Sequence, residues 1–308
     1  MNYQLNELKL LLSSPRIGTY ERFFTGHTEQ EVYGLYIWNK VLCGTIYPLL
    51  QAVEVSLRNT INNAAVKAYG AYWHLSIDHV PFNNSTDDFN YINLKNNFEE
   101  ARRNWLKKEN GKRKNSGHPL LPSNHMPDFN CIVAETEFST WEFSLHRCFF
   151  KLNAHPEKFL WPGLLGDAFK NWPQQGANST RDSIHRKVAE LRLFRNRLSH
   201  HEPLWKGVGI NREEDALIFI NKKIDIIEEL LSIISTDKVE FIRSKKLLKN
   251  ARILASKKSL DIYRERCQNT TLSIRKKNKF KKFILSMNEN TGPEIINLWG
   301  RKIIIGLA

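Results

Sequence analysis

The sequence predicts an all-α protein, a helical bundle followed by a basic C-terminal extension or small helical subdomain. Apolar residues recur at spacings of three and four over several long segments, which is the period of one helix face. Prolines and glycines stand near the ends of these segments, where helices commonly stop. With 308 residues and 41% hydrophobic content, the chain can build one large domain or two modest ones.

The first long helical segment is predicted over residues 29 to 69. Pro48 interrupts it and lacks a backbone donor, so we expect two helices or one kinked helix. Gly70 is the expected stop. The apolar residues at helical spacing are Leu35, Trp38, Leu42, Ile46, Leu49, Val53 and Leu57.

The middle of the chain has a different composition. Residues 106 to 130 are rich in Lys, Asn, Ser, Gly and Pro with little periodicity, which predicts a loop or a mobile insertion. A helix is expected from about residue 133 to 152, with Trp141, Leu145 and Phe149 on the face that packs into the core.

The next helix is predicted to begin near Ser179 and to end at about Glu202, before Pro203. Arg195 lies on its core-facing stripe. A guanidinium at such a position needs a partner or a ligand, because an unpaired buried charge is costly. The apolar residues of the same stripe are Ile184, Val188, Leu191 and Leu198.

Helical spacing also predicts a helix over about residues 213 to 235. We therefore predict one helical domain over residues 1 to 235, with the polar insertion at about 106 to 130. Residues 240 to 308 interleave basic and apolar residues and are predicted to form a separate basic C-terminal region. Within it, residues 299 to 307 fit a short strand or a docking tail.

The segment before Pro203 gathers side chains suited to phosphodiester chemistry in an Arg-Asn-x-x-x-His arrangement of Arg195, Asn196 and His200. On a helix, Asn196 and His200 share one face, while Arg195 and His200 can flank a small anion from neighbouring turns. An imidazole can transfer protons near neutral pH, and a guanidinium binds phosphate oxygens. The alternative is that these residues only satisfy the last carbonyls of the helix.

Three blocks of sequence resemble the Abi-like (abortive infection) proteins of prokaryotes, members of the HEPN superfamily. They are RNRLSHHEP at 195–203, EVSLRNTI at 54–61 and LYIWN at 35–39. Residues 136–143 form a looser fourth block, and the resemblance spans about residues 15 to 235.

The resemblance implies an HEPN-like helical bundle and a homodimer. HEPN ribonucleases join two Arg-x4-6-His motifs across a dimer interface as one metal-independent RNA-cleaving site. Arg195 and His200 would then be catalytic, with Asn196 assisting them. The residues expected to support this site are Glu54, Arg58, Asn59 and His201; for Glu54 and Arg58 the alternative is a surface salt bridge at i,i+4.

The excess positive charge is concentrated in a few segments. The formal net charge is +14, and fifteen Lys or Arg against two acids lie between Arg243 and Lys282. Such clustering is typical of a protein that binds a polyanion, and the Arg–His motif favours RNA. The residues expected to contact RNA are Arg102, Arg103, Lys107, Lys108, Lys245, Lys246, Lys249, Arg275, Lys276, Lys277, Lys279, Lys281 and Lys282.

No membrane association is expected, because the chain has no amino-terminal signal, no lipidation motif and no apolar run long enough to span a bilayer. We therefore expect a cytoplasmic protein.

No metal or cofactor is expected either. The chain has no Walker loop, dinucleotide fingerprint or nucleophile elbow. His200 and His201 are adjacent, so on a helix their side chains diverge by about 100° and do not easily clasp one metal. The cysteines show no Cys-x-x-Cys spacing and are expected to be reduced thiols; they are Cys43, Cys131, Cys148 and Cys267.

The residues and the resemblance together predict a metal-independent endoribonuclease of antiviral defence. In this hypothesis, His200 of one copy takes the proton of a ribose 2′-hydroxyl, His200 of the other protonates the leaving 5′-oxygen, and Arg195 stabilises the phosphorane. The alternative is a non-catalytic protein that forms a stable complex with a structured RNA. A third possibility is a basic scaffold that recognises double-stranded nucleic acid by its backbone.

Overall fold

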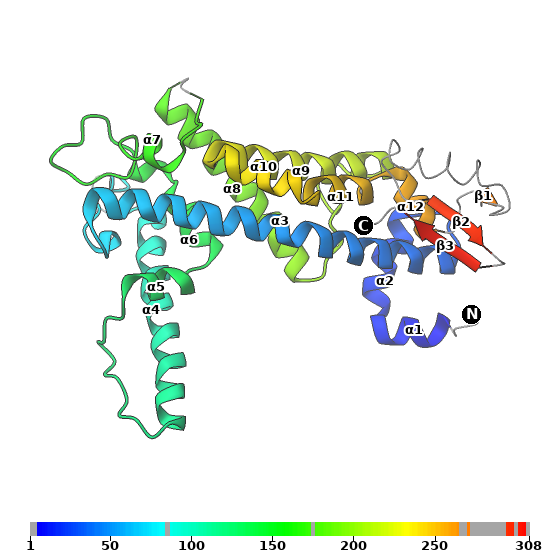
Figure 1. The fold of residues 1–308 in the computed structure, drawn as a ribbon, viewed down its shortest axis with the longest axis horizontal. Helices are drawn as coiled ribbons and strands as arrows, with labels where there is room; N and C mark the ends of the chain where they lie inside the picture. The colour runs from blue at the N-terminus through cyan, green and yellow to red at the C-terminus, as the bar shows by residue number, and fades with distance from the viewer. Residues whose placement is uncertain are drawn as a thin grey trace. The chain divides into compact units, whose positions relative to one another are not determined.

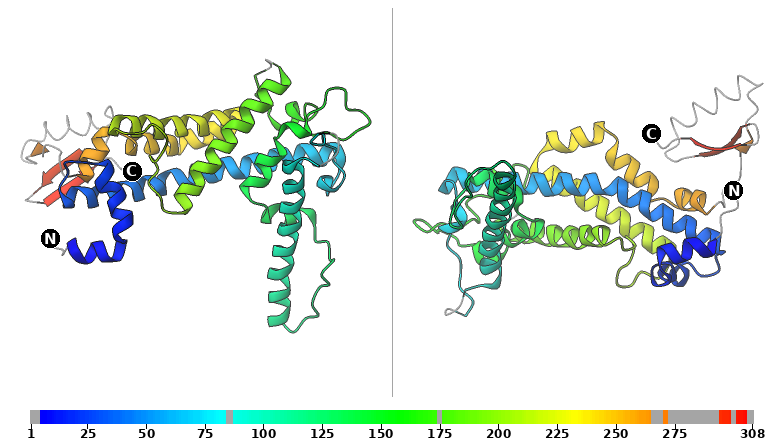
Figure 2. Two further views of the ribbon diagram at one scale, coloured as in Figure 1. Left: turned by 180° about the vertical axis from the view of Figure 1, so that it is seen from behind. Right: turned by 90° about the horizontal axis from the view of Figure 1, so that it is seen from below.

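A computed structural model describes residues 5–83, 87–173 and 176–264, together with three short strands between residues 270 and 305. The fold is all-α, as predicted (Figures 1 and 2). Among the described residues, no helix combines the length and apolar character needed to cross a membrane. The helices are α1 (Leu5–Leu12), α2 (Ser14–Phe23), α3 (Glu29–Tyr69), η1 (Trp73–Leu75), α4 (Phe89–Asn115), α5 (Phe129–Glu135), α6 (Phe138–Ser144), η2 (Arg147–Phe149), α7 (Leu165–Ala168), α8 (Ala177–Ser199), α9 (Glu213–Ile234), α10 (Thr236–Ser244), α11 (Leu247–Leu254) and α12 (Lys257–Tyr263).

The three strands form a small sheet in the order β1 (Thr270–Thr271), β2 (Glu294–Leu298) and β3 (Arg301–Ile305). β2 pairs parallel with β1 and antiparallel with β3. β3 lies within residues 299 to 307, for which the sequence fits a short strand or a docking tail.

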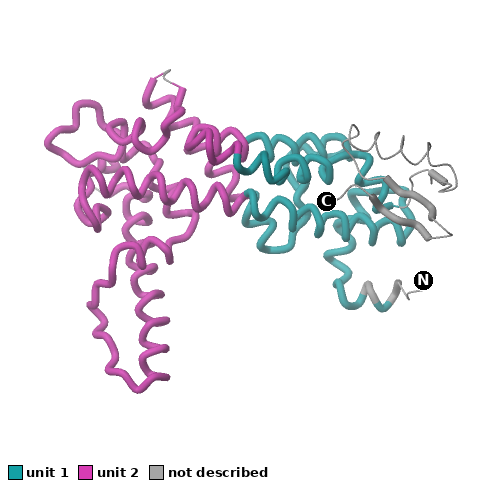
Figure 3. Tube along the Cα trace, viewed as in Figure 1, with its two compact units in different colours: residues 1–49, 194–226, 241–308 teal, residues 50–193, 227–240 magenta. Residues whose placement is uncertain are grey.

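The chain folds into two compact units that alternate along the sequence (Figure 3). Unit 1 comprises residues 1–49, 194–226 and 241–308, and unit 2 comprises residues 50–193 and 227–240. The described residues 241–264 of the basic C-terminal region thus contribute helices to unit 1. The division into a helical domain, residues 1 to 235, and a separate region, residues 240 to 308, stays a prediction.

α3 is one continuous helix of 41 residues, with Pro48 inside it and Gly70 following it at φ +84°. All seven apolar residues predicted for its core face have no exposed surface. Burying each such side chain contributes about 1.5–3 kcal/mol, whereas an interior proline costs about 3 kcal/mol. The free energy gained by burying the seven apolar side chains therefore exceeds the cost of Pro48 in the helix interior.

α4 corrects the prediction for residues 106 to 130, because it continues to Asn115 and makes the first part of that segment helical. Residues 106–115 include four Lys, one Arg and one Glu, and these residue types have good helix propensity. A low apolar content removed the periodic signal on which the sequence prediction depended.

The rest of the polar segment, residues 116–128, is a loop that is bonded to α4. Arg102 Nη1 donates to the carbonyl oxygens of Ser123 and His125, at 2.8 and 2.9 Å. Asn110 exchanges two hydrogen bonds with the backbone of Leu121, at 3.1 and 2.8 Å. These contacts hold the loop along the helix.

The single helix predicted for residues 133 to 152 is wrong, since this segment is divided among α5, α6 and η2. Thr136 is extended, with ψ 147°, and separates α5 from α6. Its hydroxyl accepts a hydrogen bond from Trp141 Nε1 at 3.1 Å, which stabilises the break. Trp141, Leu145 and Phe149 are nevertheless fully buried, as predicted.

In unit 1, the end of α11 is held by polar contacts with α3 and α9. Trp38 Nε1 donates to the carbonyl of Leu254 at 2.8 Å, and Asn221 Nδ2 donates to the carbonyl of Ala255 at 2.9 Å. Both bonds satisfy carbonyls at the end of α11, so this helix has a defined position on the unit.

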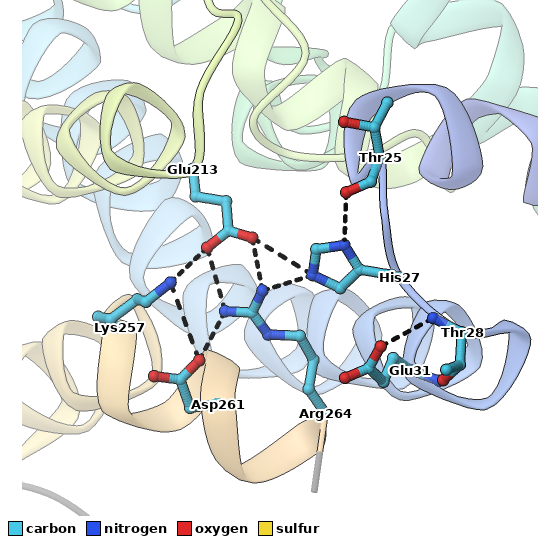
Figure 4. A network of polar contacts seen from close by, with 8 residues as sticks. All are labelled: Thr25, His27, Thr28, Glu31, Glu213, Lys257, Asp261 and Arg264. Carbon is cyan, nitrogen blue, oxygen red and sulfur yellow. Dashed lines mark hydrogen bonds and ion pairs between the residues drawn. The ribbon is translucent and has the colours of Figure 1, made fainter. Parts of the chain in front are cut away.

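α12 is attached by an ionic network around Arg264, whose side chain is 1% exposed (Figure 4). Its guanidinium lies 2.5 Å from Glu213 Oε1 and 2.6 Å from Asp261 Oδ1. Nη1 also lies 2.6 Å from His27 Nε2, and His27 Nδ1 lies 3.0 Å from the carbonyl of Thr25. With the ring proton on Nδ1, His27 donates to Thr25 and accepts from Arg264. The network therefore pairs a charge that would be costly to bury alone.

Gly34 of α3 allows the backbone of α12 to approach closely. A Cβ atom at this position would lie 1.9 Å from the carbonyl oxygen of Tyr263, whereas a Cβ at Gly44 of the same helix would meet nothing within 4 Å. We therefore expect Gly34→Ala to lower the free energy of unfolding by about 1–3 kcal/mol, because α12 must move away.

The matched control is Gly44→Ala, which should raise the free energy of unfolding by about 0.5–1 kcal/mol through the helix propensity of alanine. Urea denaturation of both variants measures these changes. An equal effect of the two substitutions would contradict the packing described for α12.

Candidate active site at the end of α8

α8 carries the predicted stripe and places Arg195 at its edge. Ile184, Val188 and Leu191 are buried, as is Phe194, whereas Leu198 of the predicted stripe is only half-buried. Arg195 is half-buried, and its Nε atom has almost no accessible surface. The guanidinium therefore emerges from the apolar stripe, which agrees with its predicted position.

α8 ends at Ser199, three residues before the predicted end at about Glu202. His201 adopts a left-handed conformation, with φ +59°. Its N–H donates to the carbonyl of Leu198 at 3.1 Å, and the N–H of Glu202 donates to the carbonyl of Arg197 at 2.9 Å. This pair of hydrogen bonds is a Schellman motif, in which a glycine is usual at the position of His201.

Two neighbouring polar residues of α3 hold this turn in place. Asn39 is fully buried, and its Oδ1 accepts the N–H of Leu204 at 3.1 Å. Lys40 Nζ lies 3.4 Å from the carbonyl oxygen of His201 and donates to it. Burial lowers the pKa of the Lys40 ammonium, and the charge of Arg16 acts in the same direction.

Trp205 anchors the other end of the turn. It is 2% exposed and lies among Tyr20, Phe24 and Trp38, with ring centroids 5.0, 5.2 and 5.8 Å away. An aromatic ring of this size buries about 150–250 Å² of surface. Residues 200–203 are therefore fixed between the end of α8 and a buried tryptophan.

The four predicted residues at this end of α8 differ in exposure. His200 and His201 are exposed, while Arg195 and Asn196 are half-buried. All four lie within seven consecutive residues of unit 1. An exposed imidazole can exchange protons with a bound phosphate, and a guanidinium can bind phosphate oxygens.

The predicted supporting residues Glu54, Arg58 and Asn59 lie on α3 in unit 2. There Arg58 Nε donates to Asn59 Oδ1 at 3.4 Å. Their role toward Arg195 and His200 stays a prediction.

Asn39 belongs to the LYIWN block that carries the resemblance, but the sequence analysis predicted no role for it toward the turn, and it did not single out Lys40 or Trp205. One feature of the sequence could have indicated the role of Asn39, namely an amide side chain next to Trp38 within a strongly apolar helix. A buried amide needs a partner, but its partner Leu204 is 165 residues away and has no recognisable pattern.

Among the predicted RNA contacts, Arg102 differs from the others. Its side chain is 12% exposed and bonded to Glu99 as well as to the loop carbonyls. Hydrogen bonds from Arg102 and then Arg103 lower the pKa of Glu99 to about 2. Arg102 therefore holds the 116–128 loop.

The remaining described residues of the predicted RNA-contacting set are all exposed: Arg103, Lys107, Lys108, Lys245, Lys246 and Lys249. Those outside the described residues are Arg275, Lys276, Lys277, Lys279, Lys281 and Lys282.

Comparison with known proteins finds a match to the sequence model of one family, described as Abi-like protein, over residues 2–206. The matched range includes the end of α8 and the turn through Trp205. No curated protein and no solved structure matches the chain.

The left-handed conformation of His201 generates a stability prediction. A non-glycine residue in this region costs about 1–2 kcal/mol, so His201→Gly should raise the free energy of unfolding by about 1 kcal/mol. The matched control is Ser199→Gly, two residues earlier and still helical, which should lower it by about 0.5–1 kcal/mol. Chemical denaturation that moves both variants in the same direction would contradict the assigned turn.

Proposed function

The chain belongs to the Abi-like protein family, and from this premise we propose that it is a metal-independent endoribonuclease of the HEPN type that acts in abortive infection defence. One observation carries the chemical part of the proposal. An exposed His200 follows the last helical residue of α8, on a turn that Asn39 and Trp205 hold in place, and Arg195 and Asn196 lie in the last turn of the helix before it.

The proposed reaction is an in-line displacement at phosphorus. One His200 removes the proton of a ribose 2′-hydroxyl, and the resulting oxygen attacks the adjacent phosphate. Arg195 stabilises the negative charge of the phosphorane, and a second imidazole protonates the departing 5′-oxygen. The products are a 2′,3′-cyclic phosphate and a 5′-hydroxyl. A fixed turn favours this chemistry because catalysis by positioning tolerates little displacement of the reacting groups.

A second copy of the chain would supply the second imidazole. In unit 1, α3 exposes Ile37 and Val41 on one face, at 49% and 38%. Lys40, which bonds the carbonyl of His201, lies within this segment. This apolar stripe beside the turn fits a two-fold contact between copies.

Stable RNA binding without cleavage is the second candidate function. The exposed Lys245 and Lys246 between α10 and α11, the exposed Lys249 of α11 and the net charge of +14 favour it independently of His200. Cleavage and binding therefore need separate tests.

Cleavage should depend on His200 and Arg195. We expect His200→Ala and Arg195→Ala each to reduce RNA cleavage by at least about 100-fold, the usual contribution of a positioned acid or base. His200 is exposed, so its removal should leave the thermal unfolding midpoint nearly unchanged. The control is His118→Ala, an exposed histidine of the 116–128 loop. Wild-type protein that binds RNA and leaves it intact would favour the second candidate function.

RNA affinity should depend on the basic surface. Each phosphate contact contributes about −0.7 to the slope of log K against log salt for a single strand. Replacing Lys245, Lys246 and Lys249 together by Gln should therefore flatten the slope by about 2, while His200→Ala leaves it unchanged. Fluorescence anisotropy over a salt series measures both. An unchanged slope in the triple variant would exclude this surface from RNA binding.

The homodimer should depend on the stripe of α3. Val41→Glu places a charge in the proposed contact and should give an inactive monomer in sedimentation velocity. Ile218→Glu, on an α9 residue that is 66% exposed, should remain dimeric and active. An active wild-type monomer at the assay concentration would contradict the two-copy mechanism.

A further inference from the structure

Unit 2 contains a cluster of three metal-ligating side chains that the proposed ribonuclease does not use. Asp88 precedes α4, His146 precedes η2, and Cys148 lies within η2. A carboxylate oxygen, an imidazole nitrogen and the thiol sulfur all lie within 4.8 Å of one another. The side chains of Asp88 and His146 are 15% and 21% exposed, and Cys148 is buried.

The three side chains of the cluster are joined by polar contacts. His146 Nδ1 accepts the backbone N–H of Cys148 at 3.4 Å and lies 3.6 Å from Asp88 Oδ1. The Cys148 thiol is hydrogen-bonded to Asp88. A proton therefore lies among atoms that can also bind a metal, and a cation that takes its place would release it.

We infer that Asp88, His146 and Cys148 form a zinc site. A thiolate, an imidazole and a carboxylate are the ligand types that Zn²⁺ takes, and three protein ligands leave one position for water. Tetrahedral zinc places its ligand atoms about 3.3–3.7 Å apart, so the cluster needs to contract by about 1 Å at most. On binding, the Cys148 thiol releases its proton to solvent, and the thiolate and carboxylate together balance the charge of the ion.

A cavity gives an ion access to the cluster. The positive charges of the two neighbouring arginines are offset by solvent in one case and by an ion pair in the other. A cavity of about 270 Å³ adjoins Asp88 and Cys148 and is also lined by Val80, Asn83 and Arg147. Arg147 is exposed. The buried Arg181 nearby is paired with Asp182 at 2.7 Å.

A zinc ion at this position would connect two segments of unit 2. It would fasten the first residue before α4 to η2, and so hold the base of the helix that carries the 116–128 loop. The inference is independent of the proposed cleavage, in which no ion takes part.

The test uses the full-length protein, stripped with EDTA and titrated with Zn²⁺ or Co²⁺. We expect one zinc per chain, a rise in melting temperature of about 5 °C or more at saturation, and a thiolate-to-cobalt charge-transfer band with Co²⁺. Cys148→Ser should abolish the band, while Cys131→Ser, a half-buried cysteine outside the cluster, should keep it.

Asp88→Asn separates metal binding from folding. Asn keeps the side-chain oxygen that accepts the N–H of Asn90 at the start of α4, so the metal-free variant should melt as the wild type does. Its zinc affinity should fall at least tenfold because the carboxylate charge is lost. Absence of the cobalt band in the wild type, or zinc binding that persists unchanged in Asp88→Asn and Cys148→Ser, would overturn the site.

Discussion

A buried amide fixes the end of α8, and the candidate site depends on it. Asn39 has no exposed surface and its oxygen accepts the N–H of Leu204. An unsatisfied buried polar group costs about 1–3 kcal/mol, so Leu204 is held against α3 and Trp205 enters the aromatic cluster beside it. The residues between Ser199 and Leu204 must then connect the end of α8 to this fixed position. They do so by placing His201 in a left-handed conformation, which leaves His200 exposed at a defined position.

This arrangement links folding energy to function. The strain at His201 is compensated by the two hydrogen bonds of the Schellman motif and by the burial of Trp205. Strained backbone persists where the surrounding structure holds it, and such positions cluster at functional sites. The turn thus holds His200 just after the helical residues Arg195 and Asn196, as the proposed site would require. The proposed zinc site would brace α4 in a comparable way, through contacts between residues distant in sequence.

The sequence predicted the parts of the structure that depend on periodic burial. The stripe from Leu35 to Leu57 is fully buried, and α9 has nearly its expected bounds. The end of α8 lay three residues from its predicted position because a left-handed histidine leaves no pattern in sequence. The helical part of the 106–130 segment was missed because α4 has few apolar residues there. The roles of Asn39, Arg102 and the Asp88 cluster come from partners far along the chain, which periodicity does not reveal.

The central claim is that His200 acts on the ribose 2′-hydroxyl. It is tested most directly with an RNA that the protein cleaves at a mapped position, resynthesised with a single 2′-deoxy nucleotide at that position and assayed in EDTA. The account predicts that cleavage at the substituted position disappears, while the unmodified RNA gives products that end in a 2′,3′-cyclic phosphate. Continued cleavage at the deoxy position, or products that end in a 3′-hydroxyl, would contradict it.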